Sequence, residues 1–358
     1  MKASVIESQS EFDALQDPWD ELARIAQCRH FYQFGWVAAC ARTLGKLAGR
    51  KLKLAALWDG DRLRAVLPLT VRRHNGVRVL EWIGVEATDY CDALIDPTID
   101  SVVALAVLWD AVRRRGGFDV VRLGHVRTDA KIRSLLDPLQ PWIETREEAQ
   151  HLPLRWPSGQ QWLQDQSPKM RERVNYGLRR IGKLGFGFHV WEPGEPLEPW
   201  LDTALAQKRA WLVARKEESF LAGPVGAEFL HASAAAMARS GSLHLSAIRS
   251  RDQMAACHVG FQHDGVLYYY MPTYDAALSK YSAGTLLRDS LIMWACDHGF
   301  REFDMLLGAH DYKSQYGVSS TPLQTVAFAH GPLGHIALST YRLLAARRKP
   351  RKDAPALS

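Results

Sequence analysis

The sequence predicts a mixed α+β protein made of two tandem domains, each with a mostly antiparallel sheet flanked by helices. A long internal repeat, alternating apolar strands joined by tight turns, and amphipathic helices support this prediction. Four landmark residues recur at one constant spacing: Trp109, Phe118, Asp119 and His125 reappear as Trp294, Phe303, Asp304 and His310. A repeat of this length has the size of a domain. We therefore interpret the chain as two related halves that have diverged.

The length and composition agree with two cores. The chain has 358 residues, of which 47% are hydrophobic and 23% charged, so it can bury two ordinary interiors. We expect an N-terminal domain over residues 1–155, a basic helical linker with an entry strand over 156–196, a C-terminal domain with the candidate functional site over 197–345, and a basic disordered tail over 346–358.

The order of elements is predicted to be the same in both halves. In the first half, alternating apolar residues from Leu52 and the hairpin signal Asn75-Gly76 predict an antiparallel meander. Asp100 precedes a helix that Gly116 ends, and a strand follows at 118–123. In the second half the same pattern predicts strands over 242–248, 254–262 and 266–272, a helix over 285–298, a strand over 301–307, and then a further strand over 323–329 and a last helix over 333–347.

Charge and cysteine usage narrow the class of protein. The formal charge of +6 favours anionic partners, and much of it lies in a helix at 167–183 and in the tail. No apolar run approaches the ~20 residues that span a bilayer, and the N-terminus has no signal-peptide core. We therefore expect a cytoplasmic protein without a transmembrane segment, with contact to a membrane surface left open. The five cysteines have no metal-site spacing, so no metal is expected.

The two copies differ just before the repeated helix. The second copy has Ser282-Ala283-Gly284-Thr285 there, whereas the first has Asp96 and Asp100. A small-residue turn lets backbone N–H groups approach a phosphate at a helix N-terminus, and aspartates would repel one. The alternative is that Ser282 only caps its helix.

The copies differ again after the repeated strand, where the second copy continues with Gly308, Asp311, Tyr312 and Lys313. Lys313 could contact a phosphate or a carboxylate, and Asp304 or Asp311 could accept a proton. A structural role for Asp304 is the alternative, because Asp119 occupies the same place in the first copy.

These residues resemble a known family, the acetyltransferases similar to the cellulose-biosynthesis protein CelD (a BioF2-like acetyltransferase domain). It is a branch of the GNAT superfamily related to the FemABX transferases. The matching positions are Tyr274-Asp275, Ser282-Ala283-Gly284, Leu286-Leu287, Gly299, Phe303-Asp304, Gly308 and Tyr312-Lys313, with Leu67-Pro68-Leu69 and Asp89-Tyr90-Cys91-Asp92 in the first half and Ser167-Pro168-Lys169 between the halves. Ala283 departs from the proline that is common in the family.

The resemblance implies two tandem GNAT-like folds and an enzyme, an acyltransferase that uses acyl-CoA, with acetyl-CoA expected first. The acceptor would be an amine or hydroxyl of a small molecule or glycan of the cell-envelope or polysaccharide type. The donor is expected at Ser282, Ala283, Gly284 and Thr285. Catalysis is expected from Asp304, Tyr312 and Lys313, and the acceptor pocket from Tyr270 and Tyr274.

Two alternatives remain. The donor could be an aminoacyl-tRNA, as in FemABX relatives, and the basic helix 169–183 favours this reading, although the chain has no coiled-coil insertion that would meet tRNA. Otherwise the protein could be a non-catalytic scaffold in polysaccharide biosynthesis. The sequence does not choose the acceptor, the acyl chain length, N- or O-transfer, a ligand of the N-terminal half, or the oligomeric state.

Overall fold

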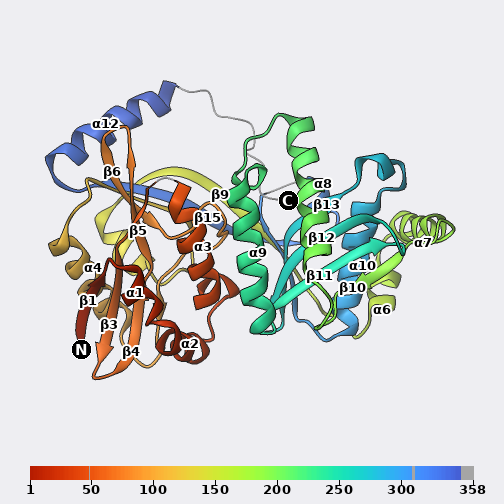
Figure 1. Cartoon of the computed structure of the whole chain (residues 1–358), viewed down its shortest axis with the longest axis horizontal. Coiled ribbons are helices and arrows are strands. Elements are labelled where there is room, and N and C mark those ends of the chain that lie inside the picture. The colour runs from red at the N-terminus through yellow and green to blue at the C-terminus, as the bar shows by residue number, and fades with distance from the viewer. Residues whose placement is uncertain (48, 309–310, 348–358) are drawn as a thin grey trace. The chain divides into compact units, whose positions relative to one another are not determined.

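The chain forms two compact units in a computed structural model that describes residues 1–47, 49–308 and 311–347. Unit 1 comprises Met1–Glu148 together with the segment from Thr321 onward, and unit 2 comprises Ala149–Ser320. In Figure 1 the first part of unit 1 runs from red to yellow and its returning segment is blue, while unit 2 runs from yellow-green to blue. The chain thus leaves unit 1 once and comes back to it.

Unit 1 contains two groups of strands with helices packed on them. Its elements are β1 (Lys2–Ile6), α1 (Gln9–Asp13), α2 (Gln16–Ile25), α3 (Phe34–Leu47), β2 (Lys51–Leu52), β3 (Leu54–Asp59), β4 (Arg62–Leu67), β5 (Leu69–His74), β6 (Val77–Trp82), β7 (Leu94–Ile95), α4 (Ser101–Arg115), β8 (Val120–Arg127), α5 (Arg133–Leu136), the start of β9 (Trp142–Pro153), most of β15 (Ser319–Ala329) and α12 (Gly331–Arg347). The strand orders are β1-β3-β4-β7 and β15-β8-β6-β5-β2. Helix α4 packs on β1 and β3.

Unit 2 is built on one group of strands in the order β10-β11-β12-β13-β14-β9. Its elements are α6 (Gly159–Asp165), α7 (Pro168–Gly182), β10 (Gly187–Val190), α8 (Glu198–Arg215), α9 (Pro224–Arg239), β11 (Leu243–Arg249), β12 (Met254–His263), β13 (Val266–Tyr274), α10 (Ala283–Asp297), β14 (Glu302–Leu307) and α11 (Asp311–Ser314). Helices α8 and α10 both pack on β12 and β13.

The predicted fold class and the repeated order of elements are confirmed. In unit 1, α4 leads into β8, which pairs parallel to β6 through Val79–Val120 and Leu80–Val121. In unit 2, α10 leads into β14, which pairs parallel to β13. The other pairs within these groups are antiparallel, as in β5–β6 and β12–β13. Both copies therefore keep the same arrangement: an antiparallel meander, then one helix, then one parallel strand.

The predicted boundaries differ from the compact units at three places. The strand and helix assigned to the C-terminal domain, β15 and α12, belong to unit 1, because β15 pairs antiparallel with β8 from Leu323–Arg127 to Ala329–Val120. The end of β9, assigned to the N-terminal domain, belongs to unit 2, because it pairs with β14. The tail predicted over 346–358 lies outside the described residues from 348 onward.

The third difference concerns the predicted linker at 156–196, which is part of the core of unit 2. Trp162 of α6 and Val174 of α7 are fully buried in the cluster that α10 completes. The amide of Gly159 donates to Asp297 of α10 at 2.8 Å. Gly177 lies so close to Leu286 that a Cβ there would stand 2.6 Å from Leu286 Cδ2. Amphipathic helices that carry basic residues on their outer side were thus mistaken for a connection.

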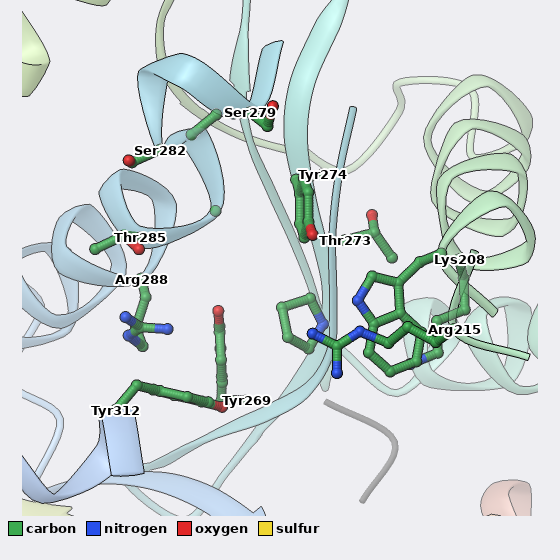
Figure 2. A pocket seen from close by; sticks show the side chains of 14 residues that line it. Lys208, Arg215, Tyr269, Thr273, Tyr274, Ser279, Ser282, Thr285, Arg288 and Tyr312 are labelled. Atoms are coloured by element: carbon green, nitrogen blue, oxygen red, sulfur yellow. The ribbon is translucent and has the colours of Figure 1, made fainter. Parts of the chain in front are cut away.

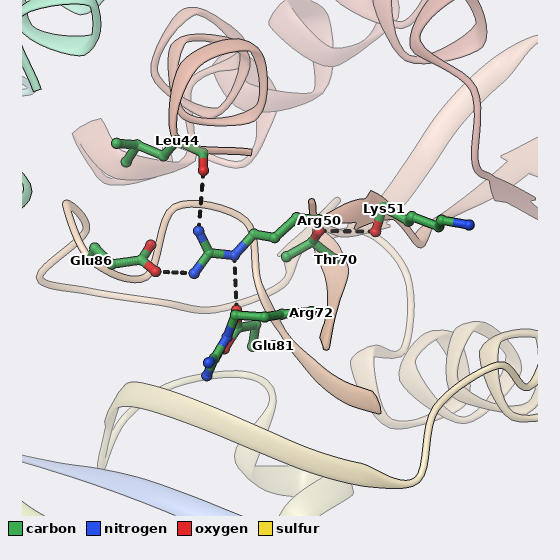
Figure 3. Close-up of polar contacts among 7 residues, drawn as sticks. All are labelled: Leu44, Arg50, Lys51, Thr70, Arg72, Glu81 and Glu86. Carbon is green, nitrogen blue, oxygen red and sulfur yellow. Dashed lines mark hydrogen bonds and ion pairs between the residues drawn. The ribbon is translucent and has the colours of Figure 1, made fainter. Parts of the chain in front are cut away.

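A buried ion-pair network fixes β2 in unit 1, as Figure 3 shows. Arg50 has only 6% of its side chain exposed; its Nε donates to Glu81 Oε1 at 2.9 Å and its Nη1 to the carbonyl of Leu44 at 3.2 Å. Its Nη2 contacts Glu86, and Arg72 makes a second pair with Glu81 at 2.9 Å. Because the charges are desolvated, each depends on its partner.

Replacing Arg50 is therefore expected to destabilise unit 1. Arg50→Met leaves Glu81 and Glu86 short of one cation inside the protein, and breaking such a buried pair costs about 3–5 kcal/mol. The matched control is Arg42→Met, because Arg42 pairs with Asp13 at 2.8 Å on the surface and exposed pairs contribute less than ~1 kcal/mol. Thermal unfolding followed by circular dichroism should show a clear fall in Tm for Arg50→Met alone; equal Tm values for the two variants would contradict the assignment.

Two histidines inside unit 2 give a pH dependence. Burial lowers the pKa of His244 to about 3 and that of His258 well below its ordinary value, so both are neutral in the folded chain. Neither nitrogen of His244 has a hydrogen-bond partner in the described part of the chain. In the unfolded chain both titrate near 6.5.

The folded state therefore binds fewer protons than the unfolded state below pH ~6.5, and stability falls as the pH drops from there toward the folded pKa values. Each such histidine costs about 1.4 kcal/mol per pH unit in that window. Replacing His244 by Phe, next to Trp294 at a ring distance of 4.6 Å, should reduce the slope of Tm against pH between 6.5 and 4.5. An unchanged slope would show that His244 does not carry this dependence.

Candidate functional site

A cavity of about 440 Å³ opens in unit 2 where the end of β13 meets the start of α10 (Figure 2). Its walls come from α8, β13, α10 and the segment after β14. The lining residues are Lys208, Trp211, Arg215, Tyr269, Pro272, Thr273, Tyr274, Ser279, Ser282, Ala283, Gly284, Thr285, Arg288 and Tyr312. The residues predicted to hold the donor, Ser282 to Thr285, thus all lie on this cavity, together with Tyr274 and Tyr312 from the other predicted roles.

The start of α10 presents backbone donors to the cavity. Ser282 adopts the left-handed conformation, with φ 55° and ψ 38°, and its side chain makes no capping bond. Its carbonyl accepts from the amides of Thr285 and Leu286, both at 3.0 Å. The amides of Ala283 and Gly284 have no acceptor within the described ranges. Unpaired amides and the positive end of the helix dipole make this turn receptive to an anion.

The corresponding helix of unit 1 is closed to an anion. Its N-cap, Asp100, accepts from the amides of Val102 at 2.8 Å and Val103 at 3.2 Å. A carboxylate of the chain itself thus caps two amides in the first turn of α4, whereas the start of α10 has no side-chain cap. The predicted difference between the two copies is present in the backbone geometry.

The strands β13 and β14 separate next to the cavity. Their parallel pairing runs from Val266–Glu302 to Tyr268–Asp304, after which no further pair joins them in the described residues. Strand β13 continues to Tyr274, and the residues of β13 that line the cavity, beginning with Tyr269, all come after the last pair. The cavity therefore lies where the two parallel strands diverge.

Arg288 of α10 is held in a fixed orientation on the cavity wall. Its Nε donates to the hydroxyl of Tyr316 at 2.9 Å, and that hydroxyl donates to Asp289 at 2.6 Å. Arg173 of α7 closes the chain with an ion pair to Asp289 at 3.0 Å. The guanidinium of Arg288 stands 4.3 Å from the ring centre of Tyr312. An arginine fixed in this way loses little side-chain entropy when it binds a ligand.

Helix α8 supplies two more cations. Figure 2 shows Lys208 and Arg215 on the other side of Tyr274 from the residues of α10. Both cations contact the ring of Trp211, at 4.4 Å and 4.6 Å from its centre. Burial lowers the pKa of Lys208 to about 8. Three cations and no carboxylate are found among the lining residues that the structure describes, so the cavity favours an anionic ligand.

Two of the predicted catalytic residues, Asp304 and Lys313, do not line the cavity. Asp304 is 1% exposed, and its Oδ1 accepts from the amide of Leu306 at 2.8 Å. Lys313 is fully buried, and its Nζ donates to the carbonyls of Met305, Leu306 and Leu307 at 2.8, 3.2 and 2.9 Å. Leu306 has φ 60°, and the β14–β9 register shifts here. Both side chains thus hold an irregular turn of β14, which agrees with the structural alternative for Asp304.

The remaining predicted residues divide in the same way. Tyr274 lies on the cavity, but Tyr270 is buried against Phe261, with ring centres 5.3 Å apart, and is not a lining residue. The repeat landmark His310 and the side chain of Asp311 lie outside the described residues.

The sequence-based prediction missed Lys208, Trp211, Arg215, Tyr269 and Arg288. The first three stand at helical spacing along one side of α8, and Arg288 is one turn beyond Gly284, so the helical period was the available signal.

Neither a metal site nor a membrane span is found within the part of the chain that the structure describes. No group of three or more His, Cys, Asp or Glu residues there is placed to hold a metal ion. None of the described helices has the length and apolar character needed to cross a bilayer.

Comparison with known proteins agrees with the fold of unit 2. Residues 168–314 match the family model described as an acetyltransferase (GNAT) domain. This region begins at α7 and ends at α11, so it includes α8, β13, α10 and every residue that lines the cavity. No curated protein matches the chain.

Two solved structures resemble the chain over nearly its whole length. FemX is similar with a TM-score of 0.61 at 11% identity, covering 96% of this chain and 100% of FemX. A tandem GNAT protein from the clavulanic acid biosynthesis pathway is similar with a TM-score of 0.52 at 13% identity, covering 92% of this chain and 99% of that one. The chain has the fold of tandem GNAT proteins, and its second unit contains the region that matches the GNAT acetyltransferase domain.

Proposed function

We propose that the protein is an acyltransferase that moves an acyl group, acetyl in the first place, from acyl-CoA to an amine or hydroxyl of an acceptor. The single observation that carries the proposal is the uncapped start of α10, whose amides open onto a cavity lined by three cations. A GNAT domain match over the same residues supports it. The resemblance in sequence to CelD-like acetyltransferases favours a cell-envelope or polysaccharide-type acceptor.

In this proposal the donor's pyrophosphate binds the amides of Ala283 and Gly284, with the Ser282 and Thr285 hydroxyls beside it. A helix N-terminus binds phosphate through its unpaired amides and its dipole together. Arg288, one turn further along α10, adds a fixed charge. Tyr274 packs against Gly284, where a Cβ would lie 3.5 Å from its ring, and it borders the acceptor side of the cavity.

The thioester would lie where β13 and β14 diverge, and catalysis would consist largely of positioning two reactants. The acceptor's nitrogen or oxygen bonds to the thioester carbon, the carbon–sulfur bond breaks, and the acceptor's proton passes to solvent. Tyr312, the predicted catalytic residue on the cavity, would donate a proton to the leaving thiolate and regain one from solvent. Asp304 and Lys313 act as positioning residues, because they hold the turn of β14 that leads to Tyr312.

An aminoacyl-tRNA donor is the second candidate, favoured by the similarity to FemX. Helix α7 is the basic helix that suggested RNA binding in the sequence. Several of its arginines instead bind other groups within unit 2. Arg173 pairs with Asp289, Arg171 donates to the carbonyls of Gln164 and Gln166, and Arg180 donates to that of Lys280. Fewer charges are then directed at a nucleic-acid backbone than the sequence suggests. Acyl-CoA therefore remains the preferred donor.

Binding of CoA should depend on the size and charge at position 284. Gly284→Asp places a carboxylate against the pyrophosphate and is expected to weaken CoA binding at least ~100-fold, since like charges a few ångströms apart cost several kcal/mol near a protein surface. Gly284→Ala is the matched control, because its methyl group makes only ordinary contact with Tyr274. Isothermal titration with CoA measures the affinity of both variants. If Gly284→Asp binds CoA as tightly as the wild type, the pyrophosphate does not bind at this turn.

Binding of acetyl-CoA should also weaken as Lys208 loses its charge. Because the pKa of Lys208 is lowered to about 8, its contribution is complete well below pH 8 and absent well above it. The affinity for acetyl-CoA should therefore be several-fold lower at pH 9 than at pH 7. A tenfold loss would correspond to ~1.4 kcal/mol of binding free energy. Lys208→Met should bind more weakly at pH 7 and show a flat profile. If wild type and variant follow the same profile, Lys208 does not contact the donor.

A further inference from the structure

Helix α12 of unit 1 presents an apolar face to solvent. The large apolar side chains on this face, spaced as on one side of a helix, are Leu333 (53% exposed), Ile336 (67%), Leu343 (66%) and Leu344 (51%). Thr340 lies between them on the same side. Exposed apolar residues are normal when scattered singly, whereas a continuous group marks an interaction surface.

The opposite face of α12 is fixed to unit 1. A Cβ added to Gly334 would stand 1.8 Å from the carbonyl oxygen of Asp119, which shows how closely the helix approaches the chain there. Tyr341 donates to Glu144 at 2.8 Å and packs edge-on against Trp142, with ring centres 5.7 Å apart. In Figure 1 α12 runs beside β6, and it contacts β6 and β8. The helix is therefore held in place while its apolar side stays outward.

The charged residues of α12 are all basic. Helix α12 contains no Asp or Glu, and Arg342 lies beside the apolar face with its guanidinium 5.7 Å from the ring centre of Trp142. Arg347 ends the helix, and the sequence that follows adds Arg348, Lys349, Arg351 and Lys352, with Asp353 as its one acidic residue. An apolar helix face joined to a cluster of basic residues is the combination that binds anionic lipid surfaces.

We propose that α12 binds the surface of an anionic lipid bilayer, with the helix lying in the plane of the interface. Leu333, Ile336, Leu343 and Leu344 would enter the boundary between headgroups and acyl chains. The positive charge of α12 and of the sequence after it would strengthen the attraction to anionic headgroups. At 17 residues the helix is shorter than a bilayer-spanning one, so it would lie on the membrane rather than cross it.

The same charges argue against a second copy of this chain as the occupant. Two copies that packed their α12 faces together would bring two basic segments side by side, and like charges at such a contact oppose association. An anionic lipid surface instead attracts every one of these charges. The surface lies in unit 1, apart from the cavity residues of unit 2, so this proposal does not rest on the proposed transfer reaction.

Vesicle co-sedimentation of the full chain tests the proposal. The probes are vesicles of phosphatidylcholine alone and of phosphatidylcholine mixed with phosphatidylglycerol. We expect binding to the mixed vesicles, and weaker binding when salt rises from ~0.1 M to ~1 M, because the Debye length falls from about 10 Å to about 3 Å. The double variant Ile336→Glu/Leu343→Glu should lose at least ~10-fold in partitioning.

The matched control is Val102→Glu/Val103→Glu, since Val102 and Val103 are also exposed apolar helix residues, at 55% and 50%, in the first turn of α4. The control should bind vesicles like the wild type, and both variants should keep the wild-type circular dichroism spectrum and Tm. Wild-type protein that ignores the mixed vesicles, or equal partitioning of the two double variants, would overturn the proposal. So would a wild-type dimer, measured by light scattering, that Ile336→Glu/Leu343→Glu converts to a monomer without any vesicle binding.

Discussion

The conformation of one residue governs the candidate site. Ser282 enters α10 in the left-handed region and leaves its side chain out of the capping position, so the first amides of the helix stay unpaired. Asp100 does the opposite at the equivalent helix of unit 1, where its carboxylate takes two amides. A single choice between an uncapped turn and an aspartate cap therefore decides which copy can receive an anion.

The groups behind the cavity wall give the site its shape without touching a ligand. The chain from Arg173 through Asp289 and Tyr316 orients Arg288, and it joins α7 to α10. Lys313 satisfies three carbonyls where β14 departs from regular geometry. Buried polar groups are costly unless every partner is in place. This explains why Lys313, at the end of the sequence motif, lies in the interior of unit 2.

Sequence patterns predicted the local structure well and the long-range grouping less well. Period and turn residues were enough for the meander, the helix and the parallel strand of each copy, and the small-residue turn coincides with the uncapped start of α10. Which strand pairs with which is a non-local property, so the return of β15 to β8 left no local signal. The same reason explains Lys313: a lysine in a motif near a site looks like a ligand contact, and only the fold reveals three carbonyls within its reach. Helical spacing placed Arg288 and Lys208 on the same helix faces as other residues of the cavity. Neither was predicted, because neither belongs to a sequence motif.

The return of the chain to unit 1 through β15 and α12 has a consequence for how the protein can be divided. A fragment cut near residue 155 would lack the strand that covers β8, and it would expose that edge to other strands. The complementary fragment would carry β15 and α12 without the surface on which they pack. Unit 1 therefore cannot be completed until β15 and α12 have been synthesised, whereas unit 2 is formed by one continuous stretch of the chain that precedes them. Joining the two termini and opening the chain between the units would make unit 1 a continuous piece.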